Sequence, residues 1–313
     1  MLELHLDAGT LRTVEMGSVK TEEQISIVAS RTGLSFSRFQ SDIVCLRAFA
    51  LSKNKVVNFV ETAREFERAL DLHGANQGAR KGLARLLQAQ GDFVGALKWL
   101  EEERQNDSSA SEEARELCGT LLVQAGHLVE ARAYLERAEK AFPPNGSIHY
   151  WLGRVYWLLG DEFRSNKDFA MRQALLAVKA NSNDSKGFAL LGSLYAERND
   201  MDRARRSHAK AFELDGSQTD SALFLSDALL SSSSASDQAA AARLHSAVLR
   251  SSPMCKWAAH RLGAYLLTQR RADEALGAFQ SMIRAAPEDP AGWEGLADSY
   301  RAQGKFMASL QVS

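Results

Sequence analysis

The chain has 313 residues, 45% of them hydrophobic and 25% charged, a composition ordinary for a soluble globular protein. Its 38 basic and 39 acidic side chains leave a net charge of −1, which argues against a chain built as a whole to coat a phosphate backbone. The three cysteines form no CxxC pair. The N-terminus lacks the pattern of a secretory signal, and no run of roughly 18 apolar residues predicts a membrane span. These features predict a soluble intracellular protein that does not cross a membrane.

Most of the sequence repeats with a period close to 34 residues. A fixed period of this length is typical of repeat proteins, and it determines how the individual helices are interpreted. We expect residues 1–42 to hold a degenerate or partial repeat, and residues 43–313 to hold tandem repeats. The repeats begin near residues 43, 77, 112, 146, 185, 219, 256 and 290. The last of them is truncated in its second helix, so we expect either further repeats after Ser313 or a chain that is a fragment.

The eighth position of every repeat is small, and the second helix carries a recurring alanine. The eighth positions are Ala50, Ala84, Gly119, Gly153, Gly192, Ser226, Gly263 and Ala297. Two antiparallel helices approach closely only where side chains are small, and stacked neighbours then bury the remaining apolar faces. This pattern is that of tetratricopeptide repeats. It predicts an all-α, right-handed superhelix (an α-solenoid) of about eight helix-turn-helix repeats.

Two repeats are longer than 34 residues. In the repeat from 146, the surplus is expected between the two helices, within DEFRSNKDF at residues 161–169. In the repeat from 219, it is expected in a flexible serine-rich turn within residues 231–238. Insertions in solenoids fall in turns because the stacked faces do not absorb them. The role of the serine-rich turn at 231–236 stays open.

No catalytic or nucleotide-binding motif is present in the sequence. There is no GxxxxGK[ST], no HExxH and no GxSxG, and the seven histidines are scattered over different repeat positions. No pair of histidines at i and i+4 offers a metal-binding face. We therefore expect a protein that is not an enzyme and that binds neither a cofactor nor a metal.

The inner face of such a solenoid is its natural binding surface, and its positions 2, 5, 9 and 12 on each first helix define the candidate residues. The candidate interaction residues are Tyr150, Arg154, Trp157, Trp257 and His260. Aromatic residues and arginine are enriched at binding hot spots. For Trp157, packing against the next repeat is an equal alternative. Only Lys81 and Arg85 approach the pattern of a chaperone-type carboxylate clamp, and the groove lacks a continuous basic track for RNA.

From about residue 146, longer motifs add to the generic pattern. In order they are YWLGRVYWLLGDEFRSNKDFAMRQALLAVKANSND, LLGSLYAERNDMDRARRSHAKAFELDGSQTDS and CKWAAHRLGAYLLTQRRADEALGAFQSMIRAAPEDPAGWEGLADSYRAQGKFMASLQ. Over roughly half of the chain, this ordered set resembles the N-terminal arm of the tetratricopeptide scaffold subunit of the superkiller complex. The first 145 residues add little that is specific to that family.

The resemblance implies a non-catalytic scaffold that holds an RNA helicase and WD-repeat subunits together in the cytoplasm, with a nuclear pool left open. That assembly delivers mRNA to the exosome for 3′–5′ decay, so contact with RNA would be indirect at most. In the family the main contacts to these subunits lie in later repeats, which leaves direct partner binding by this region in doubt. Two alternatives remain: a generic adaptor of the co-chaperone kind, and a regulatory repeat arm of a larger enzyme such as a glycosyltransferase. The oligomeric state is not predicted.

Overall fold

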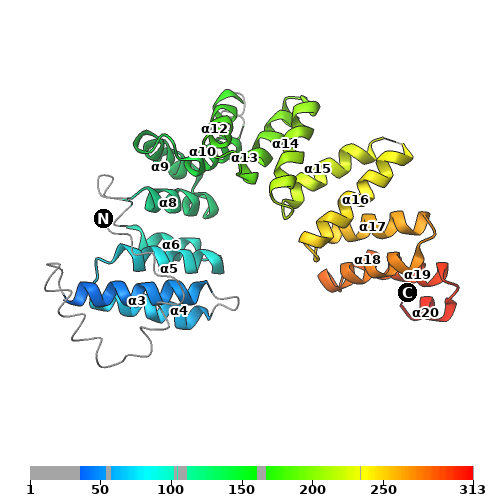
Figure 1. The fold of residues 1–313 in the computed structure, drawn as a ribbon, viewed down its shortest axis with the longest axis horizontal. Helices are drawn as coiled ribbons and strands as arrows, with labels where there is room; N and C mark the ends of the chain where they lie inside the picture. Colours follow the sequence, from blue (N-terminus) through cyan, green and yellow to red (C-terminus); the bar gives the residue numbers. More distant parts are fainter. Residues whose placement is uncertain are drawn as a thin grey trace. The chain divides into compact units, whose positions relative to one another are not determined.

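The computed structural model describes residues 36–53, 58–101, 104, 111–160, 167–232 and 234–312, and all of its regular elements are α-helices. It divides into two compact units, residues 1–143 and 144–313. In each unit the helices run antiparallel in pairs that stack in chain order (Figure 1). The described part is therefore all-α and solenoid-like, as predicted.

Unit 1 contains six described helices. They are α3 (Phe36–Ser52), α4 (Phe59–Leu72), α5 (Gln77–Gln90), α6 (Phe93–Trp99), α8 (Glu112–Gln124) and α9 (Leu128–Ala141).

Unit 2 contains five helix pairs. They are α10 (Gly146–Leu158) with α12 (Lys167–Ala180), α13 (Ser185–Glu197) with α14 (Met201–Leu214), α15 (Thr219–Leu230) with α16 (Ala235–Ser251), α17 (Lys256–Thr268) with α18 (Ala272–Ala285), and α19 (Pro290–Ala302) with α20 (Phe306–Val312).

Seven first helices begin at the residues where the 34-residue frame begins, namely 77, 112, 146, 185, 219, 256 and 290. Side-chain caps explain several of these starts. Asn76 and Asn145 accept hydrogen bonds from backbone N–H groups three residues ahead, at 3.0 and 2.9 Å. Such caps satisfy amides that have no partner within the helix.

The first described helix begins before residue 43, where the first full repeat is predicted to start. Residue 42 lies inside α3, which starts at Phe36, and the rest of the predicted segment 1–42 lies outside the described residues. The added turns are anchored by Ser41, which is fully buried and donates its hydroxyl to the carbonyl of Ala69 at 2.6 Å. The amide of Asn76 in turn donates to Ser41 at 2.7 Å. This buried polar contact holds the helix N-terminal to residue 43.

The structure agrees with the predicted place of one insertion and differs from the prediction for the other. Helices α10 and α12 have 13 and 14 residues, so the surplus of that repeat lies between them; residues 161–166 are outside the described part. The serine-rich segment is not a turn throughout, because α16 begins at Ala235 and has 17 residues where α14 has 14. An alanine run and Asp237 in the first turn favour helix at residues 235–238.

At two of the predicted small positions, the two helices of a repeat make a very close contact. A Cβ atom on Gly192 would lie 2.6 Å from the ring of His208, and one on Gly119 would lie 2.3 Å from a methyl of Leu135. His208 and Leu135 come from the second helix of the same repeat. The pairs can therefore pack closely only without a side chain at these positions.

In six of the repeats, the turn between the two helices contains one residue with positive φ. Glycine holds this position at Gly91, Gly126, Gly160 and Gly304, with φ from 76 to 87°, but Asn199 and Arg270 hold it in two other repeats. The hydrogen bonds are the same: the N–H of Arg270 donates to Leu267, as that of Gly91 does to Gln88. At positive φ the Cβ of arginine causes steric strain, which glycine avoids because it has no Cβ.

We therefore expect Arg270→Gly to stabilise unit 2 by roughly 0.5–1 kcal/mol, because φ of 58° is strained only for a residue with a Cβ. Urea unfolding followed by circular dichroism measures the change. Arg250→Gly is the matched control: Arg250 lies in the last turn of α16, where glycine costs up to about 1 kcal/mol. Destabilisation by both substitutions would contradict the strained-turn assignment.

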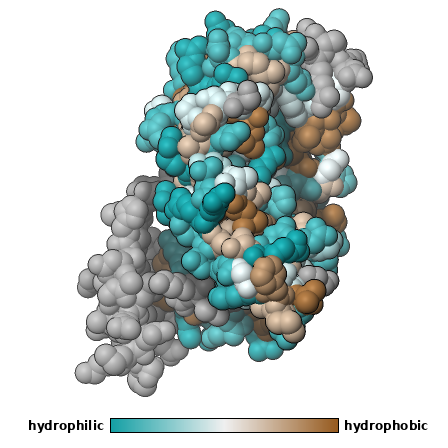
Figure 2. All heavy atoms as spheres, turned by 90° about the vertical axis from the view of Figure 1, so that its right-hand side faces the viewer, coloured by the Kyte–Doolittle hydropathy of each residue, from teal (hydrophilic) through white to brown (hydrophobic). Residues whose placement is uncertain are grey.

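None of the described helices combines the length and the apolar character needed to cross a bilayer. On the face drawn in Figure 2, hydrophilic side chains predominate and hydrophobic ones form separate patches. The single exposed apolar residues of unit 2 include Met254 and Phe306. Single exposed apolar side chains are ordinary on a protein surface and do not by themselves mark a binding site.

Candidate functional site

The first helices α10, α13 and α15 of unit 2 form one continuous face. Helix α10 contacts α13, and α13 contacts α15, in addition to the contacts that each makes with its own second helix. Positions 2, 5, 9 and 12 of these helices line a hollow of about 130 Å³, which we call the Tyr150 hollow. Its main lining residues are Tyr150, Arg154, Trp157, Lys186, Ala189, Ser193 and Asp220.

Three of the predicted site residues meet in the Tyr150 hollow. Tyr150 is 8% exposed, and its ring meets that of Trp151 edge to face with centroids 5.0 Å apart. Its hydroxyl is hydrogen-bonded to exposed Arg154. Burial raises the pKa of Tyr150 above its ordinary value, although Arg154 acts in the opposite direction, so the phenol stays neutral near pH 7. Trp157 is half-buried and lines the same hollow.

A second hollow of about 730 Å³ adjoins the first, and we call it the Trp257 hollow. Asp220, on the first turn of α15, lines both. The other walls include Leu223, Met254 and Trp257, and Met254 is 61% exposed. The structure thus brings the predicted Trp257 next to the Tyr150 hollow, through a mainly apolar recess.

The indole of Trp257 is held in place from two sides. The guanidinium of Arg261 lies 5.5 Å from its ring centroid, and the ring of buried His245 meets it edge to face at 5.8 Å. Arg261 itself pairs with Asp227 at 2.7 Å and donates to the hydroxyl of Ser226 at 2.7 Å. A fixed aromatic surface is well suited to contact with a partner.

His260 lies apart from both hollows. It is exposed, and its ring stands edge-on to that of Phe279 with centroids 6.3 Å apart. It belongs to α17 together with Trp257 but is not among the residues that line either hollow. Of the five predicted residues, four therefore lie in adjoining recesses, and a binding role for any of them stays a prediction.

Lys186, Asp220 and His208 are lining residues that the sequence did not single out. Lys186 and Asp220 both occupy position 2 of their repeats, so the repeat frame places them on the inner face, although they are not among the five candidate residues. His208 is 4% exposed, and its Nδ1 lies 3.0 Å from the hydroxyl of Ser221. Burial lowers the pKa of His208 to about 4, and nearby Asp220 opposes this shift. His208 is therefore neutral at pH 7 and contributes no charge to the hollow.

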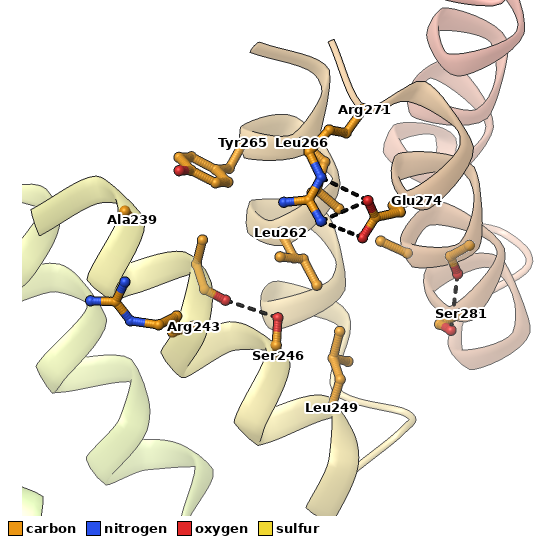
Figure 3. A pocket seen from close by; sticks show the side chains of 13 residues that line it. Ala239, Arg243, Ser246, Leu249, Leu262, Tyr265, Leu266, Arg271, Glu274 and Ser281 are labelled. Atoms are coloured by element: carbon orange, nitrogen blue, oxygen red, sulfur yellow. Dashed lines mark hydrogen bonds and ion pairs between the residues drawn. The ribbon is translucent and has the colours of Figure 1, made fainter. Parts of the chain in front are cut away.

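Another pocket, of about 430 Å³, lies between α16, α17 and α18 (Figure 3). Its floor is apolar, with Leu262 and Leu266 from α17, and Arg243 of α16 stands at its rim. On the far wall Arg271 and Glu274 form two parallel hydrogen bonds of 2.7 Å each. The charges on that wall cancel. This outer pocket contains none of the five predicted site residues.

In the described part of the chain, no group of three or more His, Cys, Asp or Glu side chains is arranged to hold a metal ion. Two of the buried histidines contact neutral polar side chains. His149 Nδ1 lies 2.7 Å from the side-chain oxygen of Gln173, and His245 Nε2 lies 2.8 Å from the hydroxyl of Ser226. These histidine contacts stabilise the packing of the helices. The two hollows, in contrast, present side chains suited to binding a partner.

Comparison with known proteins identifies the repeats. The profile described as "Tetratricopeptide repeat" matches residues 60–111 and 119–162. The profile described as "Cytochrome c-type biogenesis protein H TPR domain" matches residues 166–292. Together these matches follow the stacked pairs from α4 to the start of α19.

Several curated relatives carry superkiller names. Superkiller complex protein 3 of Mus musculus is 31% identical over 202 residues, which is 64% of this chain and 13% of that protein. Superkiller protein 3 of Saccharomyces cerevisiae is 23% identical over 292 residues, 85% of this chain and 20% of that protein. The chain thus spans no more than about a fifth of the length of these relatives.

Two solved structures share the fold. A tetratricopeptide repeat protein from Parabacteroides merdae gives a TM-score of 0.53 at 14% identity, with 83% of this chain and 98% of that chain covered. The human IFIT1 dimer with m7Gppp-AAAA gives 0.54 at 15% identity, with 97% and 77% covered. At such low identity the likeness concerns the fold alone. Taken with the matched profiles, the chain belongs to the tetratricopeptide-repeat family, and it is similar to the superkiller-type subunits of that family.

Proposed function

We propose that this chain is a non-catalytic scaffold region that binds protein partners in a superkiller-type complex. Its partners in this proposal are an RNA helicase and WD-repeat subunits. The complex acts in the cytoplasm and delivers mRNA to the exosome for 3′–5′ decay, and RNA contact by this chain is indirect. The similarity to superkiller subunits over most of the chain supports this assignment.

One structural observation carries the proposal: adjoining recesses on the first-helix face of unit 2 contain aromatic and cationic groups from successive repeats. Tyr150 and Arg154 come from α10, Lys186 from α13 and Trp257 from α17. A surface assembled from several repeats can follow an extended partner, whereas an enzyme needs a nucleophile and a base within hydrogen-bond reach. The face is therefore suited to recognition of a protein.

The co-chaperone alternative is less well supported. The candidate clamp residue Lys81 is already engaged, because its ammonium pairs with Glu113 at 3.0 Å. This contact lowers the pKa of Glu113 below its ordinary value, first through the hydrogen bond and then through the charge of Lys81. A chaperone's terminal carboxylate would have to displace Glu113 from Lys81.

We expect Trp157→Ala to weaken partner capture about tenfold while helicity is retained, because hot-spot tryptophans contribute well over 1 kcal/mol to binding. Quantitative mass spectrometry after affinity capture measures the first effect, and circular dichroism the second. Trp293→Ala is the matched control, since Trp293 lies outside both hollows and is 38% exposed. A large fall in melting temperature with unchanged capture would show that Trp157 is only a packing residue.

A further inference from the structure

The second helices of unit 2 carry an excess of positive charge that the chain as a whole does not have. Helices α12, α14 and α16 contain nine basic and four acidic side chains, which gives a net charge of +5. The first helices α10, α13 and α15 contain two basic and three acidic ones, which gives −1. The positive charge of this unit is therefore concentrated on its second helices, and we call the exposed side of α12, α14 and α16 the outer face.

Three arginines occupy the same position in successive repeats of the outer face. Arg172, Arg206 and Arg243 each follow, by two residues, the recurring alanine of their second helix. The alanines are buried, whereas all three arginines are exposed. Because the helix pairs of unit 2 stack in chain order, equivalent positions lie one after another along the stack. We call these three residues the arginine row.

The arginine row is not neutralised by neighbouring carboxylates. Within the part of the chain that the structure describes, none of its three members forms an ion pair. Arg206 donates to a backbone carbonyl, that of Asp202, at 3.3 Å. A guanidinium in this state is available for two parallel hydrogen bonds to a carboxylate of another molecule.

Most acidic groups near the row are already paired. Asp168 pairs with Arg198 at 2.9 Å, and Glu213 pairs with Lys210 at 3.2 Å. Two carboxylates of α12, α14 and α16 lack an ion pair among the described residues, against six cations in the same state. The carboxylates are Asp202 and Asp237, and the cations are Arg172, Lys179, Arg205, Arg206, Arg243 and Arg250. The outer face therefore keeps a positive charge that is complementary to an acidic partner.

Apolar recesses lie beside these cations. Arg172 lines a recess of about 360 Å³ together with leucines of α12, of which Leu175 is 48% exposed. Arg205 lines a recess of about 500 Å³ together with leucines of α15 and α16. Arg243 stands at the rim of the outer pocket, whose floor contains leucines of α17 (Figure 3). Each recess of the outer face thus combines an arginine with leucine side chains.

We propose that the outer face of unit 2 binds an acidic amphipathic segment of a partner protein. The carboxylates of this segment pair with the arginine row, and its apolar side chains enter the leucine-lined recesses. This surface is separate from the two hollows of the first-helix face. The inference rests on the proposed function, because it adds a second contact surface, and the chemistry of the segment it takes, to the same scaffold.

The recesses favour a protein segment over a single-stranded nucleic acid. A nucleic acid bound in this way stacks its bases on aromatic side chains. Among the described residues that line the three recesses, Tyr265 is the only aromatic one. Leucine-lined recesses beside arginines instead match a segment in which acidic and apolar side chains occur together.

The anisotropy of a fluorescent peptide tests this chemistry on the purified 313-residue chain. The Glu–Leu peptide has roughly 20 residues, with leucines spaced by three and four residues and glutamates between them, so that it is amphipathic as a helix. At least tenfold weaker binding is expected when Glu is replaced by Gln or when the same residues are placed in scrambled order, and binding is expected to weaken as salt increases. Equal affinity for the Gln peptide, or no binding of the Glu–Leu peptide, would overturn the proposal.

A fluorescent oligouridine of similar length tests the other class of ligand. It is expected to bind more weakly than the Glu–Leu peptide at the same salt concentration. Tighter binding of the oligouridine would make a nucleic acid the ligand of this face and would contradict the proposal.

Charge reversal in the protein locates the contact. The variant Arg206→Glu with Arg243→Glu is expected to weaken binding of the Glu–Leu peptide at least tenfold. The matched control is Arg64→Glu with Lys98→Glu, because these exposed cations hold the same position in two successive repeats of unit 1. Helix α4, which carries Arg64, has four acidic and two basic side chains, so it lacks the excess of positive charge.

The control is expected to bind as the parent chain does, and circular dichroism melts establish that both variants fold. If the reversed pair melts early, Arg206→Gln with Arg243→Gln replaces it, with at least threefold weaker binding expected. An equal loss in the variant and in the control, or no loss in either, would contradict the assignment to the outer face.

The peptide result and the scaffold assignment fail separately. If the purified chain selects the Glu–Leu peptide but a superkiller-type helicase is never captured, the chemistry of the outer face stands and the complex is wrong. If the helicase is captured while the peptides show no preference for Glu, the scaffold assignment stands and this inference is wrong.

Discussion

Replacing Phe279 with alanine will destabilise unit 2 by about 3–5 kcal/mol, the range for loss of a buried phenylalanine. Phe279 is 2% exposed and lies on α18. A Cβ on Gly263 of α17 would fall 2.6 Å from its ring, and one on Gly295 of α19 would fall 2.2 Å from it. One ring therefore fills the space left by two glycines, and its removal opens a cavity that three helices share.

Phe306→Ala is the matched control, because Phe306 is 64% exposed on α20. Its replacement is expected to change stability by less than about 0.5 kcal/mol. Urea unfolding followed by circular dichroism compares the two variants. An equal and small effect of both would show that Phe279 does not anchor the contact between these repeats.

Acidification will destabilise unit 2 between pH 6.5 and 4 through two buried histidines. Burial lowers the pKa of His208 and of His245 from 6.5 to about 4; Asp220 opposes the shift at His208, and Arg261 adds to it at His245. In the unfolded chain both rings take up a proton near pH 6.5, whereas in the folded unit they stay neutral down to about 4. Protonation therefore favours unfolding across this window.

The histidine contribution to stability is fully present above pH 6.5 and is lost as the pH falls toward 4. One pKa unit corresponds to about 1.4 kcal/mol, so we expect a loss of roughly 1–2 kcal/mol for each histidine at about pH 5. Urea unfolding at a series of pH values measures the slope. The double variant His208→Gln with His245→Gln should flatten it, whatever its stability at pH 7. An unchanged slope in that variant would assign the acid sensitivity to other groups.

The repeat period and the small positions were enough to predict the fold. A glycine at Gly119 or Gly192 is directly informative, because the close contact with Leu135 or His208 leaves no space for a side chain. Prolines also lie just beyond the ends of α9, α16 and α18, where a helix cannot easily continue. The repeat period predicts these packing positions because each repeat makes the same kind of contacts with its neighbours.

Other features depend on contacts that no period encodes. The early start of α3 needs Ser41 to meet Ala69 and Asn76, and the long α16 reflects local alanine content rather than the repeat frame. In the candidate site, the frame placed Tyr150, Arg154 and Trp157 on one helix face. That Lys186 and Asp220 line the same hollow depends on how α13 and α15 stack against α10, which the spacing of residues along one helix does not define.

Affinity capture with the gene product that carries this chain, followed by quantitative mass spectrometry, tests the scaffold assignment most directly. We expect stable recovery of a superkiller-type RNA helicase and a WD-repeat protein. Recovery is expected to persist in Trp293→Ala and to fall in Trp157→Ala. Recovery of chaperones without the helicase would leave the fold as described and contradict the function.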